Sequence, residues 1–126
     1  MLHGVGTDLT ELPRMARALQ NARLQSKLFT AAELSLYKSR GFAVSVLAGN
    51  FAAKEAVVKA MGTGFAGFWP NEVEILRGSK GEPYVTLHGK ARTLADKHGI
   101  AHFHISITNT AEYAMAFAVA ERADIG

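Results

Sequence analysis

Residues with alternating apolar and polar side chains fill most of the second half of the chain, and this period of two predicts β-strands. The runs lie at residues 73–76, 84–87, 102–108 and 113–121. Short polar or glycine-rich segments join them in pairs, which predicts two antiparallel hairpins. An apolar, glycine-punctuated run at residues 2–7 predicts one further strand, which is buried and ends at Asp8.

Helical spacing of apolar residues dominates the region between the first strand and the first hairpin. The expected helices cover residues 12–19, 31–41, 43–61 and, between the hairpins, 91–98. The second of them starts with Thr30 and Glu33, which have the spacing of a capping box. The order of elements predicts an α+β domain, a small and mostly antiparallel sheet with helices packed on one side, over residues 1–126 as a single domain.

Composition narrows the class of protein. The chain has 126 residues, 48% of them hydrophobic, and no cysteine, so we expect one domain with a real core and no disulfide framework or thiolate zinc site. The N-terminus lacks a basic segment followed by an apolar one, and no apolar run reaches the roughly 18 residues of a membrane span. A cytoplasmic location, with neither export nor membrane insertion, is the expectation.

The charge balance is mildly basic, with 14 Lys and Arg against 11 Asp and Glu and a net charge of +3. An excess of this size indicates an acidic partner or a phosphate-bearing ligand without identifying either. The basic residues are scattered, and no aromatic residues alternate with them as a stacking platform for nucleic acid requires. We therefore expect no nucleic-acid partner.

The most informative chemistry lies at residues 51–64. Glu55 and Lys59 are four residues apart, which places them about 40° apart on one helix face. The turn Gly62-Thr63-Gly64 follows, and its backbone N–H groups can approach a phosphate closely. The alternatives are a surface ion pair for Glu55 and Lys59 and a simple helix C-cap for Gly62.

Asp8 supplies a second carboxylate at the end of the first strand. Magnesium is usually held by one or two protein carboxylates together with water and substrate phosphate oxygens, so Asp8 and Glu55 form a candidate metal pair. The alternative is that Asp8 caps the following helix, with Glu11 completing the cap.

The last two strands each present a distinctive face. His104, Ser106 and Thr108 share one polar face, which either meets solvent or contacts a ligand. Residues 113–120 alternate bulky apolar side chains with alanine. The alanine face packs either beneath a helix of the same chain or against another subunit.

Taken together, these segments resemble the holo-acyl-carrier-protein synthase family, the small phosphopantetheinyl transferases. The matching segments are Gly-Val-Gly-Thr-Asp at residues 4–8 and on to Arg14, Phe-Thr-x-x-Glu-Leu at 29–34, residues 51–64, Gly-Glu-Pro-Tyr at 81–84, and the strand around His104. Two positions depart from the family pattern. Asn50 stands where an arginine is common, and Asn109 stands where a histidine is often found.

The resemblance implies a transferase that moves phosphopantetheine from coenzyme A to a serine of an apo acyl carrier protein. It implies that Asp8 and Glu55 bind Mg²⁺, that Lys59 contacts the coenzyme A phosphates, and that His104 and Ser106 line the coenzyme pocket. It also implies a homotrimer with sites between neighbouring chains. Arg14, with Arg17 beside it on the first helix, stands at a basic position that meets the carrier protein.

Two other functions remain open on the residues alone. The first is a non-catalytic binding module for an acidic protein, with Asp8 as a cap and Glu55 and Lys59 as a surface pair. The second is a basic nucleic-acid binder, whose affinity would depend steeply on salt.

Overall fold

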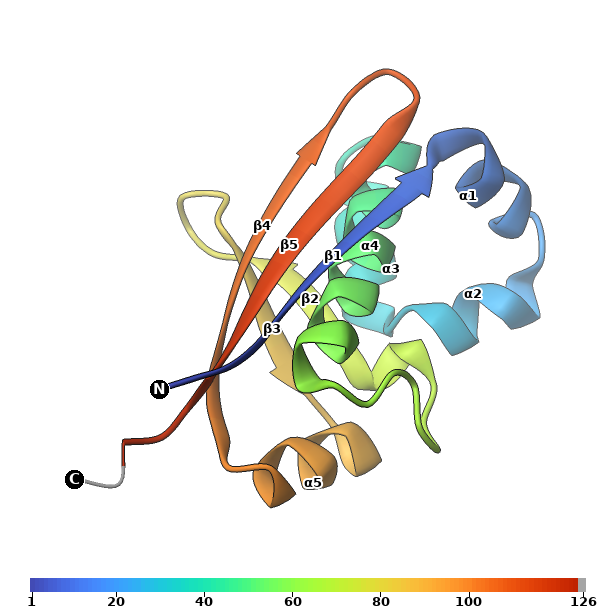
Figure 1. The fold of residues 1–126 in the computed structure, drawn as a ribbon. Coiled ribbons are helices and arrows are strands. Elements are labelled where there is room, and N and C mark those ends of the chain that lie inside the picture. Colours follow the sequence, from blue (N-terminus) through green and yellow to red (C-terminus); the bar gives the residue numbers. More distant parts are fainter. Residues whose placement is uncertain (125–126) are drawn as a thin grey trace.

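The computed structural model describes residues 1–124, which form one α+β unit (Figure 1). Its elements are β1 (Leu2–Glu11), α1 (Leu12–Ala18), α2 (Ala22–Leu28), α3 (Ala31–Ser39), α4 (Val44–Met61), η1 (Pro70–Glu72), β2 (Val73–Arg77), β3 (Pro83–Leu87), α5 (Gly89–Lys97), β4 (Ile100–Asn109) and β5 (Tyr113–Arg122). None of the helices in this described part is both long and apolar enough to cross a membrane.

The strands form two antiparallel sheets. β1, β5 and β4 make a three-stranded sheet in the order β1-β5-β4, and β2 pairs with β3 in a separate ribbon. Both predicted hairpins and the α+β class are confirmed. The expected single sheet is divided because β3 and β4 lie near each other without forming a ladder.

The long helix α4 packs across one face of the three-stranded sheet (Figure 1). The four alanines of β5, Ala114, Ala116, Ala118 and Ala120, are all buried beneath it. On β1, a Cβ atom added to Gly6 would collide with the carbonyl oxygen of Ala56, so only glycine permits this approach of helix to strand. The small residues thus set the distance between the sheet and α4.

The alanine face of β5 is therefore covered by a helix of the same chain. Of the two alternatives for this face, packing beneath a helix of the same chain is confirmed and a subunit contact through the alanines is wrong, because α4 occupies that surface. The bulky side chains point the other way: Met115 and Phe117 are 42% and 41% exposed, and Val5 and Leu9 on β1 are 57% and 61% exposed. These four residues define an exposed apolar patch, which we call the outer sheet face.

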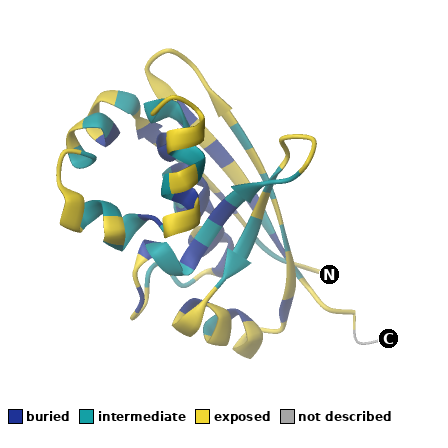
Figure 2. Ribbon diagram, turned by 180° about the vertical axis from the view of Figure 1, so that it is seen from behind, coloured by how far each residue is buried: buried dark blue, intermediate teal, exposed yellow. Residues whose placement is uncertain are grey.

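Local sequence signals place several element ends correctly. The Thr30 hydroxyl accepts a hydrogen bond from the Glu33 N–H, and the Glu33 carboxylate accepts one from the Thr30 N–H, so the predicted capping box of α3 is confirmed. Two features differ from expectation. Strand β1 continues to Glu11, and the seven-residue helix α2 occupies a segment for which no helix is predicted. Figure 2 shows the exposed outer surfaces of α1, α2 and α5 around this core.

Candidate functional site

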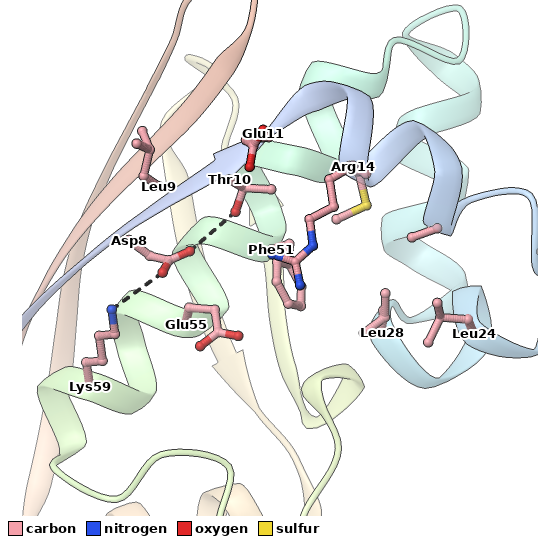
Figure 3. Close-up of a pocket in the computed structure, with 12 residues that line it drawn as sticks. Asp8, Leu9, Thr10, Glu11, Arg14, Leu24, Leu28, Phe51, Glu55 and Lys59 are labelled. Carbon is pink, nitrogen blue, oxygen red and sulfur yellow. Dashed lines mark hydrogen bonds and ion pairs between the residues drawn. The ribbon is translucent and has the colours of Figure 1, made fainter.

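Asp8 lies within β1 and points toward α4 (Figure 3). Its Oδ1 atom is 3.4 Å from Nζ of Lys59, and its Oδ2 accepts a hydrogen bond of 3.3 Å from the Thr10 hydroxyl. The N-cap residue of α1 is Glu11, whose side chain makes no capping hydrogen bond. The interpretation of Asp8 as a helix cap, with Glu11 completing it, is therefore wrong, because the strand continues three residues beyond Asp8.

Lys59 joins α4 to β1. Its ammonium donates a hydrogen bond of 2.9 Å to the carbonyl oxygen of Thr7 as well as contacting Asp8. The side chain remains 53% exposed, so it can still reach a ligand. Lys59 is thus turned toward the strand carboxylate, which a simple surface pair with Glu55 does not explain.

Glu55 faces the same space as Asp8, one turn of α4 before Lys59 (Figure 3). Partial burial raises the pKa of the Glu55 carboxyl, the nearby charge of Asp8 raises this pKa further, and Lys59 lowers it. Two carboxylates near each other, with one exposed ammonium between them and the solvent, form a site that an added cation would stabilise.

The donor set fits magnesium. Within residues 1–124 no cluster of three or more His, Cys, Asp or Glu side chains is arranged to hold a metal ion. The candidate ligands at this site are therefore the carboxylates of Asp8 and Glu55, which face the same space. This hard, incomplete oxygen set suits Mg²⁺, which commonly takes its other ligands from water and substrate phosphate.

A cavity of about 450 Å³ opens beside these groups. Its polar end includes Asp8, Glu55, Lys59 and Arg14. Its other end is apolar and runs between α1 and α2, where Met15, Ala18, Leu24, Leu28 and Phe51 line it. The site therefore combines charges for an anionic group with an apolar extension.

A second, more open cavity of about 510 Å³ shares Leu28, Phe51 and Glu55 with the first. Its remaining wall is the loop after α4, through Phe65, Gly67, Phe68, Trp69 and Pro70. Glu55 stands where the two cavities meet. We call the two joined cavities, which extend from Asp8 and Arg14 past Glu55 to Trp69, the site groove.

The Gly62-Thr63-Gly64 turn ends α4. Gly62 has a left-handed φ of 82°, and the N–H groups of Gly62, Thr63 and Gly64 all donate to the carbonyl oxygen of Val58. These N–H groups are engaged in closing the helix, so the C-cap interpretation holds. The expected backbone contact with a phosphate is not supported at this turn.

His104 and Ser106 lie on the outer sheet face, opposite α4. Across the ladder they stand beside Val119 and Phe117 of β5, and His104 Nε2 is 3.1 Å from Oε1 of Glu121. Asp8 and Glu55 lie on the side of the sheet that α4 covers. One chain thus brings together Asp8, Glu55 and Lys59, with Arg14 at the rim, and leaves His104 and Ser106 apart.

Of the two basic residues of α1 that we expect at the site, only one lines the cavity. Arg14 is exposed and lines the cavity, whereas Arg17 is exposed one turn later and is not part of its wall. Asn50, a departure from the family pattern, is fully buried and donates to Glu33 and to the carbonyl of Ile75. Asn50 therefore does not reach the site groove.

Sequence reasoning missed the aromatic wall of the groove. Phe65, Phe68 and Trp69 follow α4 with no periodic pattern. The available signal was three aromatic residues in a segment of five within a loop, which is unusual for a purely solvated connection.

Metal binding at this site should depend on pH. A metal ligand must be deprotonated, and the pKa of Glu55 is raised, so Mg²⁺ or Mn²⁺ affinity should fall at a higher pH than an ordinary glutamate would cause. Titrating Mn²⁺ by electron paramagnetic resonance between pH 4 and pH 8 measures this. Affinity that stays constant down to the range of an unperturbed glutamate, about pH 4.3, would contradict the assignment.

Comparisons with known proteins identify the family of the chain. Residues 4–118 match the model of the 4′-phosphopantetheinyl transferase superfamily. A holo-[acyl-carrier-protein] synthase from Lachnoclostridium phytofermentans is 43% identical over 121 residues, covering 96% of this chain and 97% of the relative.

Two solved structures are also similar. The holo-[acyl-carrier-protein] synthase of Neisseria meningitidis superposes with a TM-score of 0.88 at 30% identity, covering 97% of this chain and 100% of that one. The Helicobacter pylori synthase, solved in complex with coenzyme A, gives a TM-score of 0.81 at 25% identity, covering 93% of this chain and 99% of that one. With a family match over most of its length and a relative this similar, the chain belongs to the 4′-phosphopantetheinyl transferase superfamily.

Proposed function

We propose that this protein is a magnesium-dependent holo-acyl-carrier-protein synthase. It transfers the phosphopantetheine group of coenzyme A to a serine hydroxyl of an apo acyl carrier protein and releases adenosine bisphosphate. The observation that carries the proposal is the meeting of Asp8, Glu55 and Lys59 at the polar end of the site groove, in a chain of this superfamily.

Each residue of this group has a distinct role. Asp8 and Glu55 would hold Mg²⁺, which would supply positive charge to offset that of the pyrophosphate. Lys59 places a positive charge at the same phosphates while its hydrogen bond to Thr7 fixes the direction of its side chain. The serine oxygen forms a bond to the phosphorus that carries pantetheine, and the bond from that phosphorus toward the adenosine phosphate breaks.

The groove suits the rest of the substrate. The pantetheine arm is long, flexible and uncharged, and the groove continues from Glu55 along the apolar side chains of Leu28, Phe51 and Phe65. Burial of the arm there orients coenzyme A relative to the metal pair, which supplies the positioning that phosphoryl transfer needs.

We further propose that the active protein is a homotrimer joined through the outer sheet face. Apolar side chains this exposed on one face, including Val5, Leu9, Met115 and Phe117, are typical of a subunit contact. His104 and Ser106 lie on this same face. A neighbouring chain could thereby contribute them to a site built around the first chain's Asp8 and Glu55.

A binding experiment separates this function from a non-catalytic module for an acidic protein. Calorimetric titration of coenzyme A should give saturable binding that weakens at least tenfold when Mg²⁺ is removed with a chelator, because Asp8 and Glu55 would then present two uncompensated negative charges to the pyrophosphate. A non-catalytic binding module would bind neither coenzyme A nor Mg²⁺. Absence of coenzyme A binding in the presence of Mg²⁺ would overturn the proposal.

The acyl carrier protein should dock at Arg14. Arg14 stands at the rim of the cavity beside the reacting groups, and acyl carrier proteins present acidic helices, so Arg14→Glu should raise the carrier KM about tenfold and leave coenzyme A affinity nearly unchanged. Arg92→Glu on α5, outside this cavity, is the matched control. An unchanged carrier KM in the Arg14 variant would return this residue to ordinary solvated surface.

A further inference from the structure

A buried ion pair lies directly behind the site groove. Lys54 precedes Glu55 on α4, and its ammonium is 2.7 Å from Oε1 of Glu33 on α3. Both side chains are fully buried. Burial lowers the pKa of Lys54 and raises that of Glu33, and each charge opposes the shift of the other.

The ammonium of Lys54 has two further acceptors. It donates hydrogen bonds to the carbonyl oxygens of Pro70 and Val73, at 3.0 and 2.5 Å. With Glu33 these make three acceptors for three N–H groups. Pro70 directly follows the loop of residues 62–69, which forms the aromatic wall of the groove. Lys54 therefore connects the C-terminal end of that wall to the middle of α4.

Glu33 connects Lys54 to the opposite wall of the groove, near Leu28. Its carboxylate caps α3 at Thr30, accepts a hydrogen bond from the N–H of Ile75, and holds Lys54. The ring of Phe29, at the junction of α2 and α3, lies 5.4 Å from the Lys54 ammonium. Leu28, the neighbour of Phe29, lines the groove.

A buried ion pair is an inefficient source of folding stability. Desolvating two charges can cost more than their attraction returns, and apolar replacements of a whole pair are often neutral or stabilising. The two hydrogen bonds from Lys54 to the carbonyl groups of Pro70 and Val73, however, fix these groups in a direction that an apolar side chain cannot. This points to a role in geometry beyond stability.

We propose that Lys54 is a positioning residue that sets the width of the site groove for coenzyme A. Lys54 holds the wall at residues 65–70, Glu33 holds the wall at Leu28, and Glu55 is held between them on α4. Lys54 acts through these groups and does not touch substrate. The inference rests on the proposed function for its kinetic readout and on the fold alone for its spectroscopic one.

Trp69 provides the spectroscopic readout, since it is the only tryptophan of the chain and lies next to Pro70. Nζ of Lys27 on α2 sits 4.6 Å from its ring centroid, so the emission of Trp69 reports whether the two walls remain together. In Lys54→Met the carbonyl of Pro70 loses its donor. We expect red-shifted Trp69 emission, a coenzyme A KM raised about tenfold and a carrier KM within about twofold of wild type.

The double variant Glu33→Gln with Lys54→Met separates positioning from stability. Lys54→Met alone leaves Glu33 buried without its partner, which destabilises the fold, whereas the double variant removes both charges and should recover the melting temperature. The red shift and the raised coenzyme A KM should persist in the double variant, because the hydrogen bonds to Pro70 and Val73 are still missing. Lys54→Arg should restore part of the wild-type Trp69 emission and part of the wild-type coenzyme A KM.

Recovery of the wild-type emission and coenzyme A KM together with the melting temperature would overturn the proposal, because Lys54 would then contribute stability alone. If the wild-type protein lacked transferase activity, the proposed function would fail, yet the Trp69 emission of the unliganded variants would still test the positioning of the loop.

Discussion

Asp8→Asn and Glu55→Gln should each lower phosphopantetheine transfer by about 10²–10³-fold at saturating Mg²⁺. Each variant removes one of the two carboxylates that the described chain offers to a cation, and neither substituted side chain carries the charge that a divalent ion needs. Asn and Asp cap helices equally well, so loss of a cap cannot explain a defect in Asp8→Asn. Steady-state transfer rates and circular dichroism of the same preparations measure the effect.

The Glu55 variant has a second expected property. Because the folded-state pKa of Glu55 is raised above its unfolded value, the protonated carboxyl favours folding fully below the unfolded pKa, and this contribution is lost as pH rises through the folded pKa. At neutral pH and without metal, Glu55→Gln should therefore melt no lower than wild type. Near-normal turnover by both carboxylate variants would remove the metal assignment.

Phe117→Lys should convert the protein to a monomer and abolish most transfer activity, a loss of about 100-fold or more. The Phe117 ring lies on the outer sheet face beside Ser106, and a lysine there would bury an unpaired charge in a subunit contact. Light scattering at micromolar concentration should report three chains for wild type and one for the variant.

Phe42→Lys is the matched control, because Phe42 is an exposed aromatic residue, at 59%, in the turn between α3 and α4, away from the outer sheet face. It should retain assembly and activity. If wild type is already monomeric and fully active, or if Phe117→Lys remains a trimer, the outer sheet face is not the contact that completes the site.

Local patterns in the sequence were sufficient for much of the fold. The capping box at Thr30 and Glu33, the apolar helix before Gly62 and both hairpins depend on residues close together in the chain, so their signals survive without tertiary information. Helix α2 was missed because it has seven residues and none of them is buried, which leaves no apolar stripe to detect.

Features that depend on distant partners were harder to predict. β1 continues past Asp8 because Glu11 pairs with Tyr113, more than a hundred residues away in the chain. The choice between a helix and another subunit for the alanine face of β5 stayed open because the sequence cannot show that α4 needs the close approach that alanine permits. The pair of Lys54 and Glu33 joins α4 to α3 and has no local signature.

The candidate site likewise combines residues with a local sequence signal and residues that only the fold brings together. The helix spacing of Glu55 and Lys59 indicated a charged face, and the family resemblance connected it with Asp8, but only the fold brings the Lys59 ammonium to the strand carboxylate. The N–H groups of the Gly62 turn close α4 onto Val58, and their role toward a phosphate stays a prediction. Sequence spacing does not show whether a backbone donor is already engaged.

Intact-protein mass spectrometry of an apo acyl carrier protein tests the central claim most directly. The carrier is incubated with this protein, coenzyme A and Mg²⁺, beside reactions that lack one component and a carrier whose acceptor serine is alanine. The account predicts that the serine carrier gains the mass of one phosphopantetheine group, about 340 Da from the chemistry of the group transferred, only in the complete reaction. A carrier mass that stays unchanged in that reaction, with coenzyme A and Mg²⁺ both shown to bind, would contradict it.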